Sequence, residues 1–211
     1  MKLDDFVSIL NSDFYFILPG HISHEKMLPR GRNLNIDPVK YTSLKLSSVL
    51  VLLLEENDEI SVLLTQRQEY KGIHSGQIAF PGGKSEQSDS DRIFTALREA
   101  NEEIGINMKD VSVISTLTEL YIPPSNFLVL PVLGVSKSSL DLRLDDREVK
   151  EVFSISLEKL SDPKILEIRK FKVKDFYTIQ APAYVVDDKI IWGATAMILT
   201  ELLDLYKMFK S

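Results

Sequence analysis

The sequence predicts an α/β (α+β) fold, namely a mixed α/β sandwich rather than a doubly wound sheet. Three observations support this prediction. Strand-like runs rich in Val and Leu recur along the chain, one amphipathic helix lies among them, and a second helix closes the chain. A doubly wound sheet would instead alternate strands and helices throughout its length.

The first predicted elements are a short helix, a hairpin and a short strand. Residues 3–10 have an amphipathic helical pattern. Leu44–Glu55 and Glu59–Arg67 are strand-like and joined by Glu-Asn-Asp, which predicts a hairpin. Gln77–Phe80 predicts a short strand that ends at Pro81-Gly82-Gly83, a strong turn signal.

The helix that follows has recognisable ends and one apolar face. Ser88 to Asp91 offers several N-cap candidates, and Gly105 stands where a glycine commonly ends a helix. At 100° per residue, the apolar residues of this segment fall on one face and are expected to pack in the core. These residues are Ile93, Leu97, Ala100 and Ile104.

Further strand-like segments lead to the closing helix. Strands are expected at Val111–Tyr121, Phe127–Val135, Val149–Leu157 (leading into a short helical turn), Ile165–Ile179 and Ala183–Ile191. The last element is a helix over Gly193–Phe209. Its expected buried side consists of Met197, Ile198, Leu202, Leu205 and Tyr206.

Composition limits the classes of protein to which the chain can belong. Its 211 residues, 44% of them hydrophobic, are enough for a real core and predict one domain over 1–211. Within it, 1–40 is an N-terminal extension and 41–211 is the core with its C-terminal helix. A net charge of −6 argues against nucleic acid or an anionic membrane as the main partner. Without a cysteine, disulfides and thiolate metal sites are excluded.

The expected location is the cytoplasm. No apolar run is long enough to span a bilayer, and the first twenty residues mix acidic residues with short apolar runs, unlike a signal peptide. We therefore expect no membrane partner.

Three glutamates crowd the C-terminal end of the predicted internal helix. Glu99, Glu102 and Glu103 fall within about 100° of each other, opposite the apolar face. Like charges at this spacing repel by about a few tenths of a kcal/mol per pair, and the helix dipole disfavours negative charge at this end. A divalent cation bound by carboxylate oxygens would offset this cost. A solvated acidic face is the alternative.

The residues around these glutamates resemble the Nudix hydrolase box. That box is a glycine, five residues, an acidic residue, seven residues, then Arg-Glu-aliphatic-x-Glu-Glu-x-Gly-aliphatic. Gly83 opens the match, Asp89 takes the acidic position, and Arg98 to Ile106 complete it. The chain departs from the box in having Asp rather than Glu at position 89, and one extra residue before Arg98. The resemblance implies a Nudix-type α/β/α sandwich with a mixed β-sheet, and metal-dependent hydrolysis of a pyrophosphate bond.

The segment before the box resembles the added signature of the coenzyme A pyrophosphatase subfamily. The matching residues are Leu63 to Arg67, Gly76, and Phe80 to Gly83, with further matching pieces at Pro124–Phe127, Leu130–Val132, Glu148–Phe153 and Ile191–Ala196. Gln68 replaces the Ser or Ala of the signature, and Gly72 replaces a second arginine. The resemblance implies cleavage of coenzyme A or acyl-CoA into 3′,5′-ADP and a phosphopantetheine product.

The resemblance also implies roles for individual residues. The implied metal ligands for Mg²⁺ or Mn²⁺ are Glu99, Glu102, Glu103 and the Gly83 carbonyl. The implied catalytic residues are Glu103, Glu102 and Arg98, with Arg98 pairing with Glu102 one helical turn on. The implied substrate-binding residues are Arg67, Lys71, Lys84, Gly82 and Gly83. Glu103 is the preferred general base, although a water polarised by the metal needs no dedicated base.

Structural roles are expected for several neighbouring residues. Asp89 could simply cap the helix, and His74 is expected to pack or hydrogen-bond in its loop. Glu148 and Glu151 are expected to form salt bridges at a strand start, with an outer role at the metal site as the alternative. For Trp192, and equally for Phe127, a place in the core is preferred to stacking on adenine.

Two other functions stay open at this point. Because Gln68 and Gly72 depart from the signature, the substrate could be another nucleoside diphosphate derivative, such as ADP-ribose or NADH. A non-catalytic nucleotide-binding regulator is the alternative from a different class. In each case the partner is a small nucleotide, coenzyme A-like under the first hypothesis, and a homodimer is left open.

Overall fold

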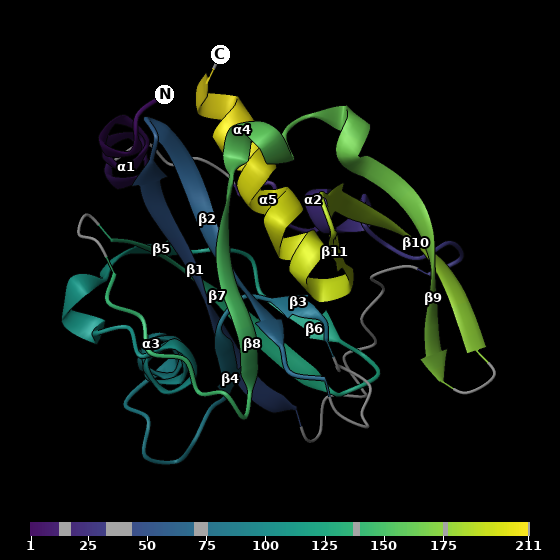
Figure 1. Ribbon diagram of the computed structural model, residues 1–211, viewed down its shortest axis with the longest axis horizontal. Helices are drawn as coiled ribbons and strands as arrows, with labels where there is room; N and C mark the ends of the chain where they lie inside the picture. The colour runs from purple at the N-terminus through teal and green to yellow at the C-terminus, as the bar shows by residue number, and fades with distance from the viewer. Residues whose placement is uncertain (13–17, 33–43, 70–75, 137–139, 175–176, 211) are drawn as a thin grey trace.

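Two β-sheets organise the protein in this computed structural model, which describes residues 1–12, 18–32, 44–69, 76–136, 140–174 and 177–210. The larger sheet consists of β1 (Lys45–Glu56), β2 (Glu59–Arg67), β3 (Ile78–Ala79), β4 (Gly82–Lys84), β5 (Ser112–Thr116), β6 (Leu120–Ile122), β7 (Phe127–Val135) and β8 (Val149–Ser156). The smaller sheet consists of β9 (Leu166–Lys174), β10 (Tyr177–Val186) and β11 (Lys189–Trp192), in the order β11-β10-β9. Figure 1 shows the smaller sheet beside the larger one.

Five α-helices accompany the sheets in the described ranges. They are α1 (Leu3–Asn11), α2 (Gly20–Glu25), α3 (Arg92–Ile104), α4 (Leu157–Leu160) and α5 (Gly193–Lys210). The described residues also contain two 3₁₀ turns, η2 (Met108–Asp110) and η3 (Pro163–Ile165). None of these helices combines the length and the apolar character needed to cross a membrane.

The larger sheet is mixed, as predicted. Its main order is β3-β2-β1-β7-β5, with β4 pairing with β1, β6 with β7, and β8 with β2. β1 and β7 run parallel, whereas the other pairs in this sheet are antiparallel. The predicted β1–β2 hairpin is confirmed, and Asn57 and Asp58 at its tip have φ values of 51° and 63°. Two consecutive residues with positive φ are typical of the type I′ turns that match strand twist.

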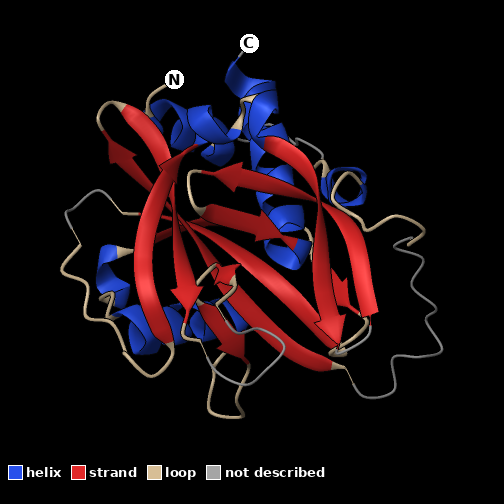
Figure 2. Ribbon diagram, turned by 45° about the vertical axis from the view of Figure 1, so that its right-hand side comes forward, coloured by secondary structure: helices blue, strands red, loops and turns tan. Residues whose placement is uncertain are grey.

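Helices cover both faces of the larger sheet, so the predicted sandwich is confirmed. Because side chains alternate along a strand, Leu50 and Leu52 of β1 pack with α3, whereas Val51 and Leu53 pack with α5 and α1. Figure 2 shows the sheet between these two groups of helices. All four side chains are fully buried, and each contributes about 2 kcal/mol of hydrophobic stabilisation.

The closing helix α5 has the buried side that its sequence predicts. Every one of the expected residues is at most 8% exposed, namely Met197, Ile198, Leu202, Leu205 and Tyr206. Tyr206 also meets Phe6 of α1 edge-to-face, with ring centroids 5.9 Å apart. The two ends of the chain therefore pack together (Figure 1).

Three strand predictions were wrong in their boundaries. Val111–Tyr121 is not one strand: β5 ends at Thr116, and the Thr118 N–H and hydroxyl turn to the Glu201 carboxylate of α5 at 3.1 and 2.6 Å. Ile165–Ile179 and Ala183–Ile191 are not the strands either, because β10 runs through the break expected near Pro182 and a turn at Asp187 separates it from β11. Pro182 pairs with Ile168 of β9, and the pairing of β10 with β11 begins only at Ala183. A proline therefore costs the sheet little at this position.

Candidate active site

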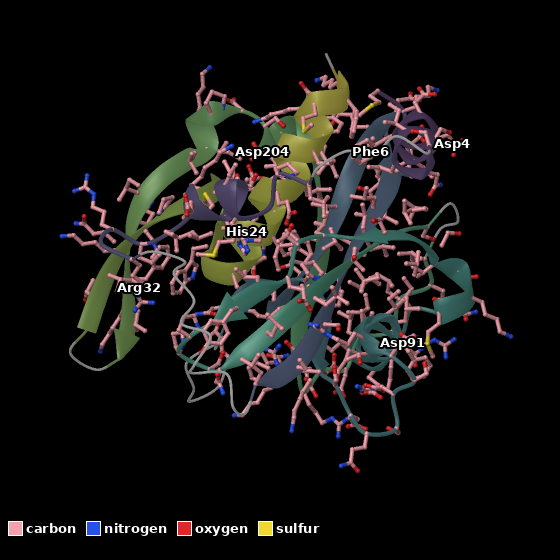
Figure 3. The ribbon with its side chains drawn as sticks, turned by 180° about the vertical axis from the view of Figure 1, so that it is seen from behind. Asp4, Phe6, His24, Arg32, Asp91 and Asp204 are labelled. Atoms are coloured by element: carbon pink, nitrogen blue, oxygen red, sulfur yellow. The ribbon has the colours of Figure 1, made fainter. Side chains whose placement is uncertain are left out.

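Helix α3 begins and ends where its sequence predicts. The Asp91 carboxylate caps it by accepting from the Phe94 N–H at 2.7 Å, and Figure 3 shows Asp91 at this end of the helix. Gly105 ends it with φ 71°, a left-handed conformation that glycine adopts without strain. The interpretation of Asp89 as a cap was wrong, because Asp91 fills that role.

The buried face of α3 is rotated from the one that periodicity predicts. Ala96, Ala100 and Ile104 are fully buried, but Ile93 is 37% exposed, so its assignment to the core was wrong. Glu103 is only 5% exposed and lies at the interface with the strands, not on a solvent-facing acidic face. The packing of α3 against β1 and β4 brings this carboxylate inside.

The buried Glu103 carboxylate is held from two sides. Its Oε2 accepts from the Gly82 N–H at 3.0 Å, and its Oε1 lies 3.7 Å from Arg67 Nη1. Burial raises the pKa of Glu103 to about 7, against the lowering effects of Gly82 and Arg67 and with the negative charges of Glu148 and Glu99 adding to the rise. The folded protein therefore carries a carboxyl group that titrates near neutral pH.

Gly82 provides that contact because β4 passes very close to β1. Gly82 has φ 155°, and a Cβ on it would lie 2.6 Å from Val49 Cα. Only glycine lets the chain approach β1 this closely and point its N–H at Glu103.

Glu99 lies one helical turn before Glu103, against Gly83. A Cβ on Gly83 would lie 2.5 Å from Glu99 Cδ, so the carboxylate occupies the space that a larger residue would need. Burial raises the pKa of Glu99, and the neighbouring Arg98 partly reverses this rise. Gly82 and Gly83 thus contact different glutamates.

Arg98 connects the acidic residues of the helix with the loop before it. Its Nη1 lies 3.0 Å from Glu102, which confirms the predicted pair, and its Nη2 lies 3.0 Å from Glu99. The same guanidinium donates to the Lys84 carbonyl at 3.2 Å and to Asp89 Oδ1 at 2.7 Å. Arg98 therefore fixes the loop to the helix as well as orienting two carboxylates.

Asp89 orients Arg98. Its carboxylate also accepts from the Glu86 N–H at 2.9 Å and the Thr95 hydroxyl at 2.8 Å. The Arg98 guanidinium and these donors hold the pKa of Asp89 well below its usual range, and Asp89 raises the pKa of Arg98. The extra residue before Arg98 does not prevent this contact.

A fourth carboxylate reaches the site from the segment that precedes β8. Glu148 Oε2 lies 3.8 Å from Arg67 Nη2, so one guanidinium lies between Glu148 and Glu103. Glu151 pairs instead with Lys189 at 2.5 Å, on the opposite face of β8. The predicted salt bridges are confirmed for both residues, and of the two, Glu148 is the one that joins the acidic site.

The remaining residues that the sequence analysis singled out do not contact the acidic residues in the described part of the structure. Lys84 is exposed at the end of β4. Lys71 and His74 lie outside the described residues. Trp192 is half-buried and stacked on Phe171 with centroids 4.0 Å apart, and Phe127 is half-buried beneath the Lys45 ammonium. Neither Trp192 nor Phe127 is fully buried, so the core assignment holds only in part.

The donor chemistry of the site fits a hard divalent cation. In the described ranges, no three acidic or histidine side chains already converge as a metal-binding group, and the carboxylates lie against Arg98 and Arg67 instead. Burial raises the pKa of Glu99 and Glu103 despite these arginines, so a bound cation would offset the cost of their buried negative charge. Carboxylate oxygens are the ligands that Mg²⁺ prefers.

Comparison with known proteins identifies the same family. A family model described as the NUDIX domain matches residues 44–176. Nudix hydrolase 15, mitochondrial, from Arabidopsis thaliana is 36% identical over 172 residues, which cover 79% of this chain and 60% of that protein. The uncharacterized Nudix hydrolase NudL of Yersinia enterocolitica is 36% identical over 147 residues, covering 68% of this chain and 73% of that protein.

One solved structure supports the architecture. The Nudix hydrolase RenU from M. smegmatis superposes with a TM-score of 0.54 at 15% identity, covering 77% of this chain and 86% of that one. At this identity the likeness concerns the fold alone. This chain spans about 60% of the length of the Arabidopsis relative, so that protein's properties do not transfer to it as a whole.

Proposed function

The chain belongs to the NUDIX family, and from this premise we propose that it hydrolyses the pyrophosphate bond of a nucleoside diphosphate derivative. One observation carries the proposal, namely the position of the buried Glu103 carboxylate. The Gly82 N–H fixes it and Arg67 of β2 lies beside it, while Glu99 and Glu102 are on the same helix as Glu103. A merely solvated acidic helix would not bury a glutamate at the cost of raising its pKa to about 7.

The acidic residues would hold a divalent cation. The proposed ligands for Mg²⁺ or Mn²⁺ are Glu99, Glu102, Glu103 and the Gly83 carbonyl. When bound, such a cation neutralises phosphate charge and lowers the pKa of a bound water. Arg98 orients Glu99 and Glu102 through contacts of 3.0 Å to each, and Asp89 in turn fixes Arg98 at 2.7 Å.

Glu103 is the proposed general base. Without metal, burial raises its pKa to about 7, and a base works best when its pKa lies near the working pH. The Gly82 N–H fixes Oε2, whereas Oε1 lies 3.7 Å from Arg67 Nη1, beyond hydrogen-bond distance, and can accept a proton from water.

The cationic residues at the rim would bind the phosphates. Arg67 is 31% exposed and lies at 3.7–3.8 Å from two carboxylates, too far for strong hydrogen bonds, so its guanidinium can exchange them for phosphate oxygens. Lys84 is exposed beside Gly82 and Gly83. Lys71 is also proposed to bind phosphate, on the basis of its position in the sequence alone.

We propose coenzyme A or an acyl-CoA as the substrate, with 3′,5′-ADP and a phosphopantetheine product. The support is the resemblance of the segments between Leu63 and Ala196 to the coenzyme A pyrophosphatases. The second candidate is ADP-ribose or NADH. It is favoured by Gln68, which departs from the signature and whose side chain contacts the segment that carries Glu148.

A substrate panel tests this choice. Purified protein is assayed with coenzyme A, ADP-ribose and NADH, each with Mg²⁺ or Mn²⁺, and kcat/KM is compared. A much lower value for coenzyme A than for a rival would overturn the first choice. If the protein binds a nucleotide but turns over no substrate, and if Glu103→Gln does not change that behaviour, the protein is a regulator instead. Glu167→Gln, an exposed glutamate of β9, is the matched control.

A further inference from the structure

We propose that Gln68 is a positioning residue of the acidic site, which it organises by fixing the segment 143–149 and, with it, Glu148. This segment is called the strap below. The inference rests on the proposed function and concerns how its site is assembled. The sequence marks Gln68 only as a departure from the coenzyme A signature, and neither periodicity nor the family box gives it a role.

The strap is attached to the end of α3. The N–H groups of Arg143 and Asp145 donate to the carbonyls of Ile104 and Glu103, both at 2.9 Å. These carbonyls belong to the last turn of the helix, where no intrahelical partner remains. The strap therefore begins with its backbone fixed to the same residue, Glu103, whose carboxylate lies in the site.

The strap then turns back toward the site. The Asp145 carbonyl accepts from the N–H groups of Glu148 and Val149, both at 2.9 Å, and the Asp145 carboxylate accepts from the Arg147 guanidinium. The Arg147 guanidinium and N–H lower the pKa of Asp145 to about 2, so this turn keeps its charge pair at neutral pH. This turn places Glu148 directly before the start of β8.

Gln68 forms hydrogen bonds with the other end of the strap. Its backbone N–H donates to the Glu148 carbonyl at 2.8 Å, and its side-chain Nε2 donates to the Asp146 carbonyl at 2.8 Å. A longer contact of 3.5 Å joins the same nitrogen to the Val149 carbonyl. A serine or alanine at position 68 has no nitrogen that could reach Asp146, so this side-chain contact depends on glutamine.

Arg67 and Gln68 together hold Glu148 from both sides. Gln68 binds its backbone, while Arg67 lies 3.8 Å from its carboxylate and 3.7 Å from that of Glu103. The Arg67 Nε is buried and lacks a hydrogen-bond partner within the described residues, where the guanidinium forms its ion pairs through Nη1 and Nη2 with these two carboxylates. If the strap moved, Arg67 would lose its ion pair with Glu148 and keep the one with Glu103, so the distribution of charge around the site would change.

A simpler explanation is that Gln68 only closes the end of the sheet. Its backbone bond to Glu148 does continue the ladder between β2 and β8. The side-chain bond to Asp146 lies beyond the end of β8 and adds nothing to that ladder. The two explanations differ in whether the effect of Gln68 requires the Glu148 carboxylate.

A double-mutant cycle separates them. Gln68→Met keeps the length of the side chain and removes its donor, and it is made alone and in Glu148→Gln. The readouts are the affinity of the metal-free protein for Mn²⁺, by calorimetric titration, and kcat with KM on the best substrate of the panel. Gln180→Met, at an exposed glutamine of β10, is the matched control.

We expect Gln68→Met to lower Mn²⁺ affinity and kcat by about tenfold, as is usual when an outer partner of a metal site is lost. In the Glu148→Gln background the same change should alter both by less than about twofold, because coupled residues are not additive. Gln180→Met should alter neither. Thermal unfolding identifies any variant that fails to fold, and Gln68→Ala then replaces Gln68→Met in the cycle.

Equal losses in both backgrounds, or no loss in either, would overturn the inference. The Mn²⁺ titration does not depend on the substrate. If the wild-type protein hydrolyses nothing in the panel while the Mn²⁺ cycle behaves as expected, the proposed function fails and the role of Gln68 stands. If the protein turns over a substrate but Gln68 and Glu148 are not coupled, the proposed function stands and the role of Gln68 fails.

Discussion

Replacing Glu103 by Gln should stabilise the metal-free protein at alkaline pH while it abolishes activity. Folding raises the pKa of this carboxyl from 4.5 to about 7, which corresponds to about 3 kcal/mol. Between these two pKa values the folded state holds the proton more tightly than the unfolded state does. The free energy of unfolding therefore falls as pH rises through this window, and the full cost of the buried charge is present above pH 7.

Glutamine removes this cost and keeps an oxygen that can accept from the Gly82 N–H. Part of the gain is lost because the amide no longer attracts Arg67, 3.7 Å away. We expect Glu103→Gln to be more stable than wild type by about 1–3 kcal/mol at pH 8 in EDTA. The two proteins should be nearly equal at pH 4.5. Urea unfolding at both pH values measures this difference.

The same variant should lose the response to metal. Adding Mg²⁺ should stabilise the wild type and raise its unfolding midpoint, whereas the variant should respond weakly because it lacks a ligand. Its kcat should fall by about 10²-fold or more. Glu102→Gln is the control for the stability effect alone, since its side chain is 58% exposed and little burial cost is relieved. A Glu103→Gln protein that is equally destabilised at both pH values, or that keeps wild-type kcat, would refute the reasoning.

Three further predictions concern the residues around Glu103. Gly83→Ala should lower kcat by about tenfold with little change in melting temperature, because the new Cβ displaces only the flexible end of Glu99; a large fall in melting temperature would contradict this. Gly82→Ala should instead destabilise the fold by about 2 kcal/mol or more in urea unfolding, because its Cβ meets the backbone of Val49 at φ 155°, and a normal unfolding midpoint would argue against that packing. Asp89→Asn should be less stable than wild type at neutral pH, since Arg98 lowers the pKa of Asp89 in the folded state. This difference should vanish as pH falls well below 3.8, and a difference independent of pH would contradict it.

Local sequence patterns were sufficient for the two main helices, the first hairpin and one ion pair of the box. The hairpin at Asn57 and Asp58, the caps of α3 and the buried side of α5 all follow from residues close in sequence. The pair Arg98–Glu102 follows in the same way, since side chains four apart on a helix are neighbours. The single-domain organisation, the cytoplasmic location and the choice of coenzyme A stay predictions.

Tertiary structure alone decided which glutamate is buried. Periodicity groups Glu99, Glu102 and Glu103 on one face, yet their side chains are 17%, 58% and 6% exposed. The difference arises because β4 brings the Gly82 N–H to Glu103, and no pattern within the helix records where β4 will pack.

The strap shows the same limit at longer range. Gln68 and Asp146 are 78 positions apart in the chain, and their contact exists only because β2 pairs with β8. An outer role at the metal site was only the alternative for Glu148, and nothing local connected this residue with Gln68. The sequence by itself therefore determined α3, α5, the β1–β2 hairpin and which acidic residues share one helix, because these depend on neighbours along the chain. Which of those groups meet, and which of them lose contact with water, depends on strand pairing between distant segments and was decided by the tertiary structure.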